Sequence, residues 1–283
     1  MITCNLQGGL GNQLFQIFTT LSYALKYSKA FFFINIPVLT NGSIIRYTYW
    51  ETFLSNLKPF LKNKNDVIQL IYLKENGFLY EDIKIPQNQN IMLVGYFQSH
   101  MYFDKYKNMI CKLIKLDEKK QIVKERMGER MVENVISMHF RLGDYKKLPE
   151  YHPILGERYY INSISYILKE QTNKNRKVSE KILYFCEDDD FLEVEKTIKI
   201  LESNFPLLKF ERENSFLNDW EQLLQMSFCS YNIIANSTFS WWGAYLNNNN
   251  EKIVCYPDEW FGKKVSHNTS TLFPEDWIKI DTK

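Results

Sequence analysis

The N-terminal segment contains a strand, a glycine-rich turn and a helix in immediate succession. Residues 2–6 are suited to a short strand, and Gly8-Gly-Leu-Gly-Asn-Gln-Leu-Phe-Gln16 follows. Apolar residues then recur at helical spacing, which predicts a helix over about 12–27. A second strand is predicted over 30–36, where the chain is again largely apolar. Because a strand–turn–helix–strand unit of this kind opens doubly wound folds, the sequence predicts an α/β protein.

The glycines of this turn allow backbone N–H groups to approach a ligand at a helix N-terminus. The turn does not match a dinucleotide-binding fingerprint, because Leu14 replaces the third glycine and Asn35 stands near the expected acidic residue. No Gly-Lys-Ser/Thr follows, which excludes a Walker-type phosphate loop as well. A plain tight turn would explain any single glycine. Three glycines followed by Asn12 and Gln13 favour a ligand site.

A second cluster of polar side chains lies at the end of a predicted strand over 135–140. Side chains alternate along a strand, so His139 and Arg141 should point the same way. Gly143 ends the strand, and Asp144 follows directly. Ligands bind at such strand ends in open α/β sheets, and the planar donors of arginine suit phosphate. The alternative is an Arg–Asp surface pair with a histidine beside it.

An acidic run, Glu187-Asp-Asp-Asp190, lies between a predicted strand and a predicted helix. Acidic residues at a helix start cap the helix and oppose its dipole, which we expect of Asp189 and Asp190. We expect Glu187 and Asp188 to contact a ligand, such as a ribose or a base. Metal binding by Asp188 and Asp190 is a third alternative.

A run of small polar residues, from Asn236 to Ser240, lies between a buried strand and a helix. Asn236, Ser237, Thr238 and Ser240 surround Phe239. Free N–H groups and hydroxyls at such a junction can bind an anion. A plain N-cap would account for only one of these residues.

Further elements follow from apolar periodicity. Strands are predicted over 91–97, 181–186, 231–235 and 253–256, and helices over 112–133, 157–170, 191–201 and 216–229. The charged helix over 112–133 is predicted to connect two lobes, residues 1–133 and 134–283. The loops over 41–90 and 146–156 are expected to shape an acceptor pocket.

The overall charge and the cysteines restrict partners and location. A net charge of +2 excludes a strongly basic nucleic-acid binder. No apolar run is long enough for a membrane span, which leaves peripheral membrane contact open. The start of the chain lacks the features of a secretory signal, and the five cysteines are scattered without a CxxC pair. We therefore expect free thiols and a cytoplasmic protein.

Taken together and in order, these motifs resemble those of the α-1,2-fucosyltransferases, glycosyltransferase family 11. The matching stretches are Gly8–Gln16, Gly95–Gln98, His139–Tyr145, Phe185–Asp188 and Ile234–Trp242. Leu142 stands where the family usually has a second arginine, in H-x-R-R-x-D. The resemblance implies a GT-B-type fold of two Rossmann-like lobes with a cleft between them. It also implies inverting transfer of fucose from GDP-fucose, with no metal or other cofactor required.

The resemblance also implies roles for individual residues. Arg141 would hold the β-phosphate of the donor, with His139 lining the donor site and Asp144 stabilising the loop or contacting the donor. The segment 236–240 would contact the diphosphate and Asp188 the nucleoside. The other lobe would close over the reacting centre through Gly9, Gly11 and Asn12.

The general base is open between Asp144 and Glu150, with Asn12 as a residue that positions the acceptor hydroxyl. We therefore predict an enzyme that transfers fucose to a glycan hydroxyl, such as the 2-hydroxyl of a galactose. The alternatives are a transferase for another nucleotide sugar and a non-catalytic nucleotide- or glycan-binding protein. The sequence does not indicate an oligomeric state.

Overall fold

The computed structural model describes residues 1–41, 44–66, 69–128, 134–213 and 216–283. By its internal contacts the chain divides into unit 1, residues 1–122 with 267–274, and unit 2, residues 123–266 with 275–283. The division falls within α3 (Leu116–Met127). The predicted lobe boundary at 133 lies outside the described residues.

Unit 2 is built on one parallel sheet of six strands, in the order β10-β9-β8-β11-β12-β13. By position in the chain this is the order 3-2-1-4-5-6, which is typical of nucleotide-binding doubly wound folds. Ile136 of β8 pairs with Tyr231 of β11 on one side and with Ile182 of β9 on the other. The strands are β8 (Val135–His139), β9 (Lys181–Phe185), β10 (Lys209–Arg212), β11 (Tyr231–Ile233), β12 (Val254–Pro257) and β13 (Ile278–Ile280).

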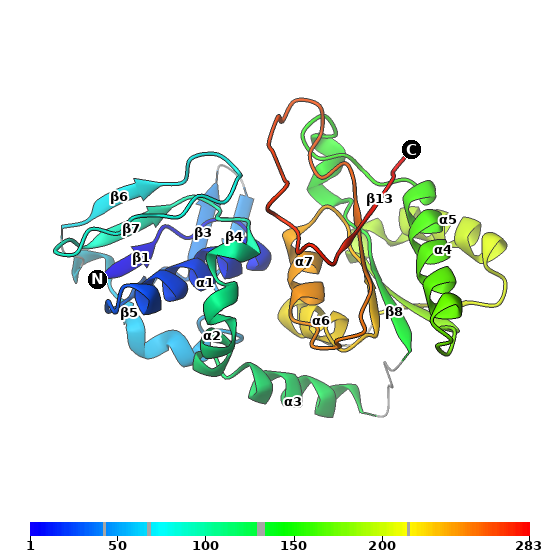
Figure 1. Cartoon of the computed structure of the whole chain (residues 1–283), viewed down its shortest axis with the longest axis horizontal. Helices are drawn as coiled ribbons and strands as arrows, with labels where there is room; N and C mark the ends of the chain where they lie inside the picture. Colours follow the sequence, from blue (N-terminus) through cyan, green and yellow to red (C-terminus); the bar gives the residue numbers. More distant parts are fainter. Residues whose placement is uncertain (42–43, 67–68, 129–133, 214–215) are drawn as a thin grey trace. The chain divides into compact units, whose positions relative to one another are not determined.

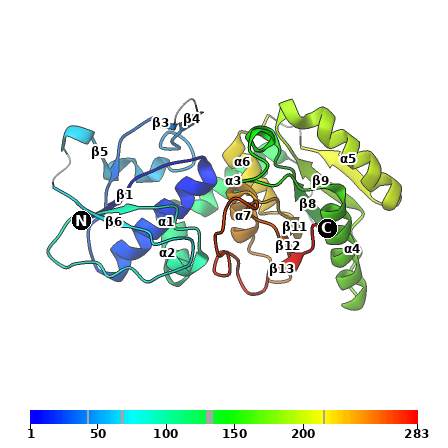
Figure 2. The same cartoon turned by 90° about the horizontal axis from the view of Figure 1, so that it is seen from above.

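Helices cover both faces of this sheet. Figures 1 and 2 show α4 and α5 on one face and α6 and α7 on the other. Alternation along β8 sends Ile136 and Met138 into the core beneath α4 and α5, whereas Val135 packs toward α6 with Met226. The helices are α4 (Glu157–Asn173), α5 (Phe191–Asn204), α6 (Asp219–Met226) and α7 (Thr238–Tyr245), with short 3₁₀ turns η5 (Gly143–Lys147) and η6 (Asp188–Asp190).

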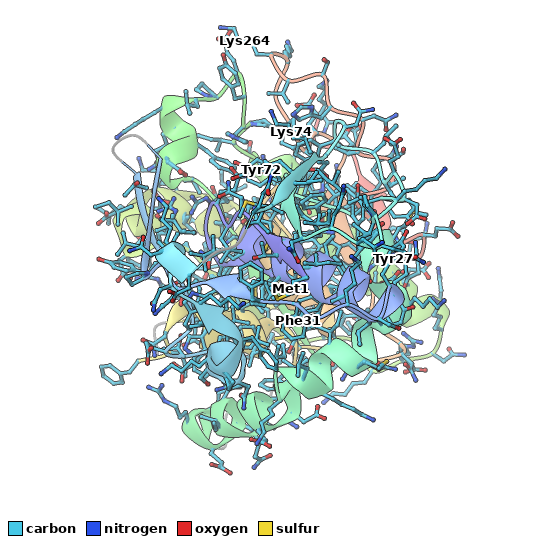
Figure 3. All side chains as sticks on the ribbon, turned by 90° about the vertical axis from the view of Figure 1, so that its left-hand side faces the viewer. Met1, Tyr27, Phe31, Tyr72, Lys74 and Lys264 are labelled. Carbon is cyan, nitrogen blue, oxygen red and sulfur yellow. The ribbon has the colours of Figure 1, made fainter. Side chains whose placement is uncertain are left out.

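Unit 1 has a smaller parallel sheet in the order β1-β7-β6. On its other edge β1 bridges to Phe31, which lies beside Met1 in Figure 3. The strands are β1 (Ile2–Cys4), β2 (Phe33–Ile34), β3 (Val38–Asn41), β4 (Ile44–Tyr47), β5 (Leu61–Lys62), β6 (Ile71–Lys74) and β7 (Ile91–Val94). The helices are α1 (Leu10–Lys26) and α2 (Lys107–Leu113), with 3₁₀ turns η1 (Ser55–Phe60), η2 (Lys64–Asp66), η3 (His100–Tyr102) and η4 (Asp104–Tyr106).

Most of the predicted elements are confirmed, with ends shifted by a few residues. The single helix expected over 112–133 is wrong, because α2 ends at Leu113 and α3 begins at Leu116. Lys115 between them has φ of +53°, which interrupts a right-handed helix. Residues 129–133 of that prediction lie outside the described residues. Among the helices in the described ranges, none is long and apolar enough to cross a bilayer.

Candidate functional site

Two loops of unit 2 meet at the point where the strand order reverses. Strands β8 and β11 are neighbours, and the segments 140–147 and 234–240 leave their carboxyl ends. The Tyr145 hydroxyl donates a hydrogen bond of 3.0 Å to the Asn236 carbonyl, which joins the two segments. In doubly wound folds, this reversal point is where ligands bind.

His139, the last residue of β8, is buried and connects β8 to α7. Its Nδ1 lies 3.0 Å from the Ser240 hydroxyl, which itself donates to the Ser237 carbonyl at 3.3 Å. Since that hydroxyl gives its proton to a carbonyl, the Nδ1–H of His139 donates to it. Burial, with a smaller effect of the Arg141 charge, lowers the pKa of His139 to about 3. The imidazole is therefore neutral at physiological pH.

Arg141 is held by two carboxylates from different loops. One Nη lies 2.5 Å from Oδ1 of Asp144, and the other contacts the Glu187 carboxylate. The guanidinium also lies over the Tyr145 ring, 5.1 Å from its centre. Burial opposes the charged form, but Glu187 and Asp144 outweigh it, so the pKa of Arg141 is raised. Leu142, where the resemblance implies a second arginine, packs in the hydrophobic core.

An aromatic group that sequence reasoning did not assign to the site adjoins Arg141. The Tyr145 and His152 rings stack with centres 4.4 Å apart, and Phe261 lies 6.2 Å from His152. Burial and the positive charge of Arg141 lower the pKa of His152, although Asp144 opposes this. Their spacing in the sequence gave no signal for this contact, because Phe261 lies more than a hundred residues after His152.

The polar run before α7 is only partly available to a ligand. Ser237 caps the helix by accepting from the Phe239 N–H at 3.3 Å, and Ser240 is bound to His139. The Asn236 amide donates to the Pro153 carbonyl at 2.9 Å, while its buried Oδ1 has no hydrogen-bond partner within the described part of the chain. Thr238 is the first residue of α7.

The acidic run after β9 does not cap α5 as expected. The Asp190 carboxylate instead accepts from the Gly143 N–H at 2.7 Å and pairs with Lys146 at 2.8 Å. A cation and an N–H group from η5 thus bind this carboxylate in place of the helix end, so the capping prediction is wrong for Asp190. Asp188 pairs with Arg212, a residue that the sequence did not single out.

The predicted glycine-rich site belongs to unit 1. Gly9 is the N-cap of α1, and Gly11 lies in its first turn. The Asn12 amide oxygen accepts from Gln98 at 3.0 Å, and the Gln13 amide donates to the carbonyls of Gly8 and Tyr47 at 3.0 and 2.9 Å. Backbone and amide groups therefore define this turn.

The remaining predicted residues are placed as follows. In unit 2, hydrogen bonds, ion pairs and the Tyr145 ring link one group of predicted residues. The group consists of His139, Arg141, Asp144, Glu187 and the segment 236–240. Glu150 is exposed and pairs with Lys264, whose side chain projects into solvent in Figure 3. Among the described residues, no three His, Cys, Asp or Glu side chains are grouped to hold a metal ion.

Comparison with known proteins identifies the family. The family model for glycosyl transferase family 11 matches residues 1–281. The chain belongs to this family. A family 11 protein of Escherichia coli named alpha-1,2-colitosyltransferase is 27% identical over 99% of both chains. The galactoside 2-alpha-L-fucosyltransferase of Caenorhabditis elegans is 22% identical over 99% of this chain and 79% of its own length.

The fold agrees with the family. The structure of the Escherichia coli ADP-heptose LPS heptosyltransferase II matches 99% of this family 11 chain and 89% of its own, with a TM-score of 0.53 and 9% identity. The predicted fold class, α/β of GT-B type, is confirmed. As a member of family 11, this chain is a glycosyltransferase. The alternative of a non-catalytic binding protein is therefore excluded.

Proposed function

We propose that this family 11 enzyme transfers fucose from GDP-fucose to the 2-hydroxyl of a galactose in an acceptor glycan. The observation that carries the proposal is that the turn containing Arg141 and the segment leading into α7 meet at the reversal point of a 3-2-1-4-5-6 sheet, where the Tyr145 hydroxyl donates to the Asn236 carbonyl. That order is typical of nucleotide-binding folds, and a guanidinium beside a helix start suits a diphosphate. The name of the Caenorhabditis elegans relative supports the choice of sugar and hydroxyl.

The reaction is a displacement at the anomeric carbon. The oxygen of the acceptor hydroxyl forms a bond to this carbon as the bond to the β-phosphate oxygen breaks, and the electron pair leaves with GDP. The hydroxyl proton passes to a base. Negative charge grows on the leaving phosphate, where Arg141 and the positive end of the α7 dipole stabilise it. No step in this scheme requires a metal ion.

In this scheme neutral His139 would position the start of α7 and would not take part in the reaction. Its bond to Ser240 fixes the start of α7 against the end of β8. Because the imidazole is uncharged, it adds no second cation beside Arg141. Asp188, mostly solvent-exposed on the neighbouring loop, would contact the nucleoside.

The general base in this scheme is one of two carboxylates of the loop after β8. Asp144 is bound to Arg141, and Glu150 is bound to Lys264. The family resemblance gives Asn12 the role of positioning the acceptor hydroxyl. Asp144→Asn and Glu150→Gln show which of the two carboxylates is the base. Loss of the base should lower kcat while GDP binding persists.

Colitose is the second candidate sugar. It is supported by the printed name of the Escherichia coli relative, which aligns along almost the whole chain. Colitose lacks the 3-hydroxyl of fucose, so a site that hydrogen-bonds this hydroxyl would discriminate strongly between the two.

The proposal is tested by incubating the full chain with GDP-fucose and a panel of galactose-terminated acceptors, with and without a chelator. We expect a product with an α-1,2-linked fucose and an equal yield in both conditions. Parallel reactions with GDP-colitose and a UDP-sugar identify the donor. Transfer from a UDP-sugar alone, or no transfer from GDP-fucose, would contradict the proposal.

A further inference from the structure

Both terminal nitrogens of Arg141 are engaged by carboxylate oxygens. Asp144, three residues along the same turn, occupies one Nη, and Glu187, from the loop after β9, occupies the other. A diphosphate offers the same chemistry, since its anionic oxygens match the paired donors of a guanidinium. A phosphate that binds Arg141 therefore competes with a carboxylate already present.

Glu187 is better placed to leave than Asp144. Its side chain is 56% exposed, against 40% for Asp144, and it belongs to a different loop from Arg141. Its carboxylate lies against the backbone of Gly143, where an added Cβ would come within 3.0 Å of Oε2. Rotation into solvent would release Arg141 without moving the turn.

Separate contacts hold the two loops together when Glu187 moves. The Asp190 carboxylate binds the Gly143 N–H and the Lys146 ammonium, and Lys146 also pairs with Glu193 at 2.6 Å. These contacts do not include Arg141 or Glu187. The turn after β8 thus keeps its shape whether or not the Glu187 contact is made.

We propose that Glu187 is an exchangeable counter-ion of Arg141. The donor diphosphate displaces its carboxylate, and the carboxylate returns to Arg141 as GDP leaves. Glu187 thus weakens GDP binding and favours product release, a role opposite to the donor contact predicted from the sequence. The inference rests on the proposed function, because it assumes that a nucleoside diphosphate binds at Arg141.

Calorimetric titration of GDP into the full chain tests this role, because the proposal predicts that the Kd for GDP falls when the Glu187 charge is removed. Glu187→Gln should lower the Kd for GDP about fivefold, which is the ~1 kcal/mol that an exposed ion pair contributes. Glu193→Gln is the matched control, because it removes the same charge from the same region but from Lys146, and its Kd should stay close to the wild-type value. A purely structural role for Glu187 would not tighten binding.

Two further titrations show whether the effect passes through Arg141 and the phosphates. Guanosine, which has no phosphate, should bind wild type and Glu187→Gln equally. In an Arg141→Gln background, Glu187→Gln should no longer lower the Kd for GDP. Glu187→Asp, which keeps the charge but shortens the reach, should tighten GDP binding less than Glu187→Gln and provides a second variant.

The outcomes separate this inference from the proposed function. Weaker binding of both GDP and guanosine by Glu187→Gln would overturn the inference and make Glu187 a ligand of the nucleoside. Equally tighter binding of both would overturn it as well, because the effect would then not depend on the phosphates. Unchanged GDP binding would also overturn it, while leaving the proposed function intact. A wild-type protein that binds no GDP would overturn the proposed function, and the inference with it.

Discussion

In each unit a glycine-containing turn follows the first strand of the parallel sheet, but the two turns have different chemistry. After β1, Gly8 has φ of +79°, and the amides of Asn12 and Gln13 hydrogen-bond to neighbouring neutral groups. After β8, the turn is organised by charges around Arg141 and Asp190. The same topology thus supports one turn organised by amide hydrogen bonds and one organised by ion pairs.

Removing the central charge of the second turn should have the largest effect. Arg141→Ala should lower kcat/KM for GDP-fucose roughly 10²–10³-fold, because it removes the proposed donor to the leaving phosphate, worth about 2–4 kcal/mol of barrier. Steady-state kinetics with a galactose-terminated acceptor measure this loss.

The matched variant is Arg141→Lys, which keeps the charge but not the paired donors. It should recover part of the lost rate, since lysine binds phosphate as a point charge. Wild-type turnover by Arg141→Ala would contradict the role of this turn in phosphate binding.

The buried histidine of the second turn should make stability depend on pH. The pKa of His139 is lowered to about 3 from an ordinary value of 6.5, so in this window the unfolded chain binds a proton that the folded chain does not. Its stabilising contribution is complete above pH 6.5 and is lost as the pH falls toward 3, at up to ~1.4 kcal/mol per pH unit. Between pH 6.5 and 5 the loss should reach roughly 2 kcal/mol.

Urea unfolding of wild type and His139→Gln at pH 7, 6 and 5 measures this dependence. The free energy of unfolding of the variant should fall less steeply with decreasing pH, because glutamine does not titrate. Parallel curves for the two proteins would show that His139 takes up its proton in the folded state as well.

The turn after β1 should be sensitive to the space around Gly8. A Cβ on Gly8 would come within 2.9 Å of the Asn12 Cβ, whereas Gly77, with φ of +81°, has open space around it. Both alanine variants carry backbone strain, but Gly8→Ala should lose a further ~1–2 kcal/mol through overpacking. Equal shifts in the urea midpoint would show that Asn12 moves aside at no cost.

Much of the fold could be predicted because buried parallel strands are continuous apolar runs, as in β8 and β9. Strand β10, Lys209–Arg212, was not predicted because it is short, charged and at the sheet edge. The sequence around Lys115 does not indicate that a helix ends there. Lysine rarely adopts a positive φ, and no glycine or proline marks the site. Strand order was also not predicted in detail, because pairing depends on contacts distant in the sequence.

The turn after β8 could be singled out from the sequence as a candidate site, but its contacts could not be predicted. His139, Arg141 and Asp144 were found because strand alternation and a glycine turn are local features. The partners of Asp190 were missed, since local capping rules do not include a turn more than forty residues earlier in the chain. The stacking of Tyr145 on His152 likewise depends on how a long loop folds back.

Hydrogen exchange with and without GDP tests most directly which of the two turns binds the diphosphate. The account predicts slower exchange on GDP binding in peptides covering 139–147 and 236–242, with little change over residues 8–13. Protection confined to residues 8–13, or absent from both peptides of unit 2 at saturating GDP, would contradict it.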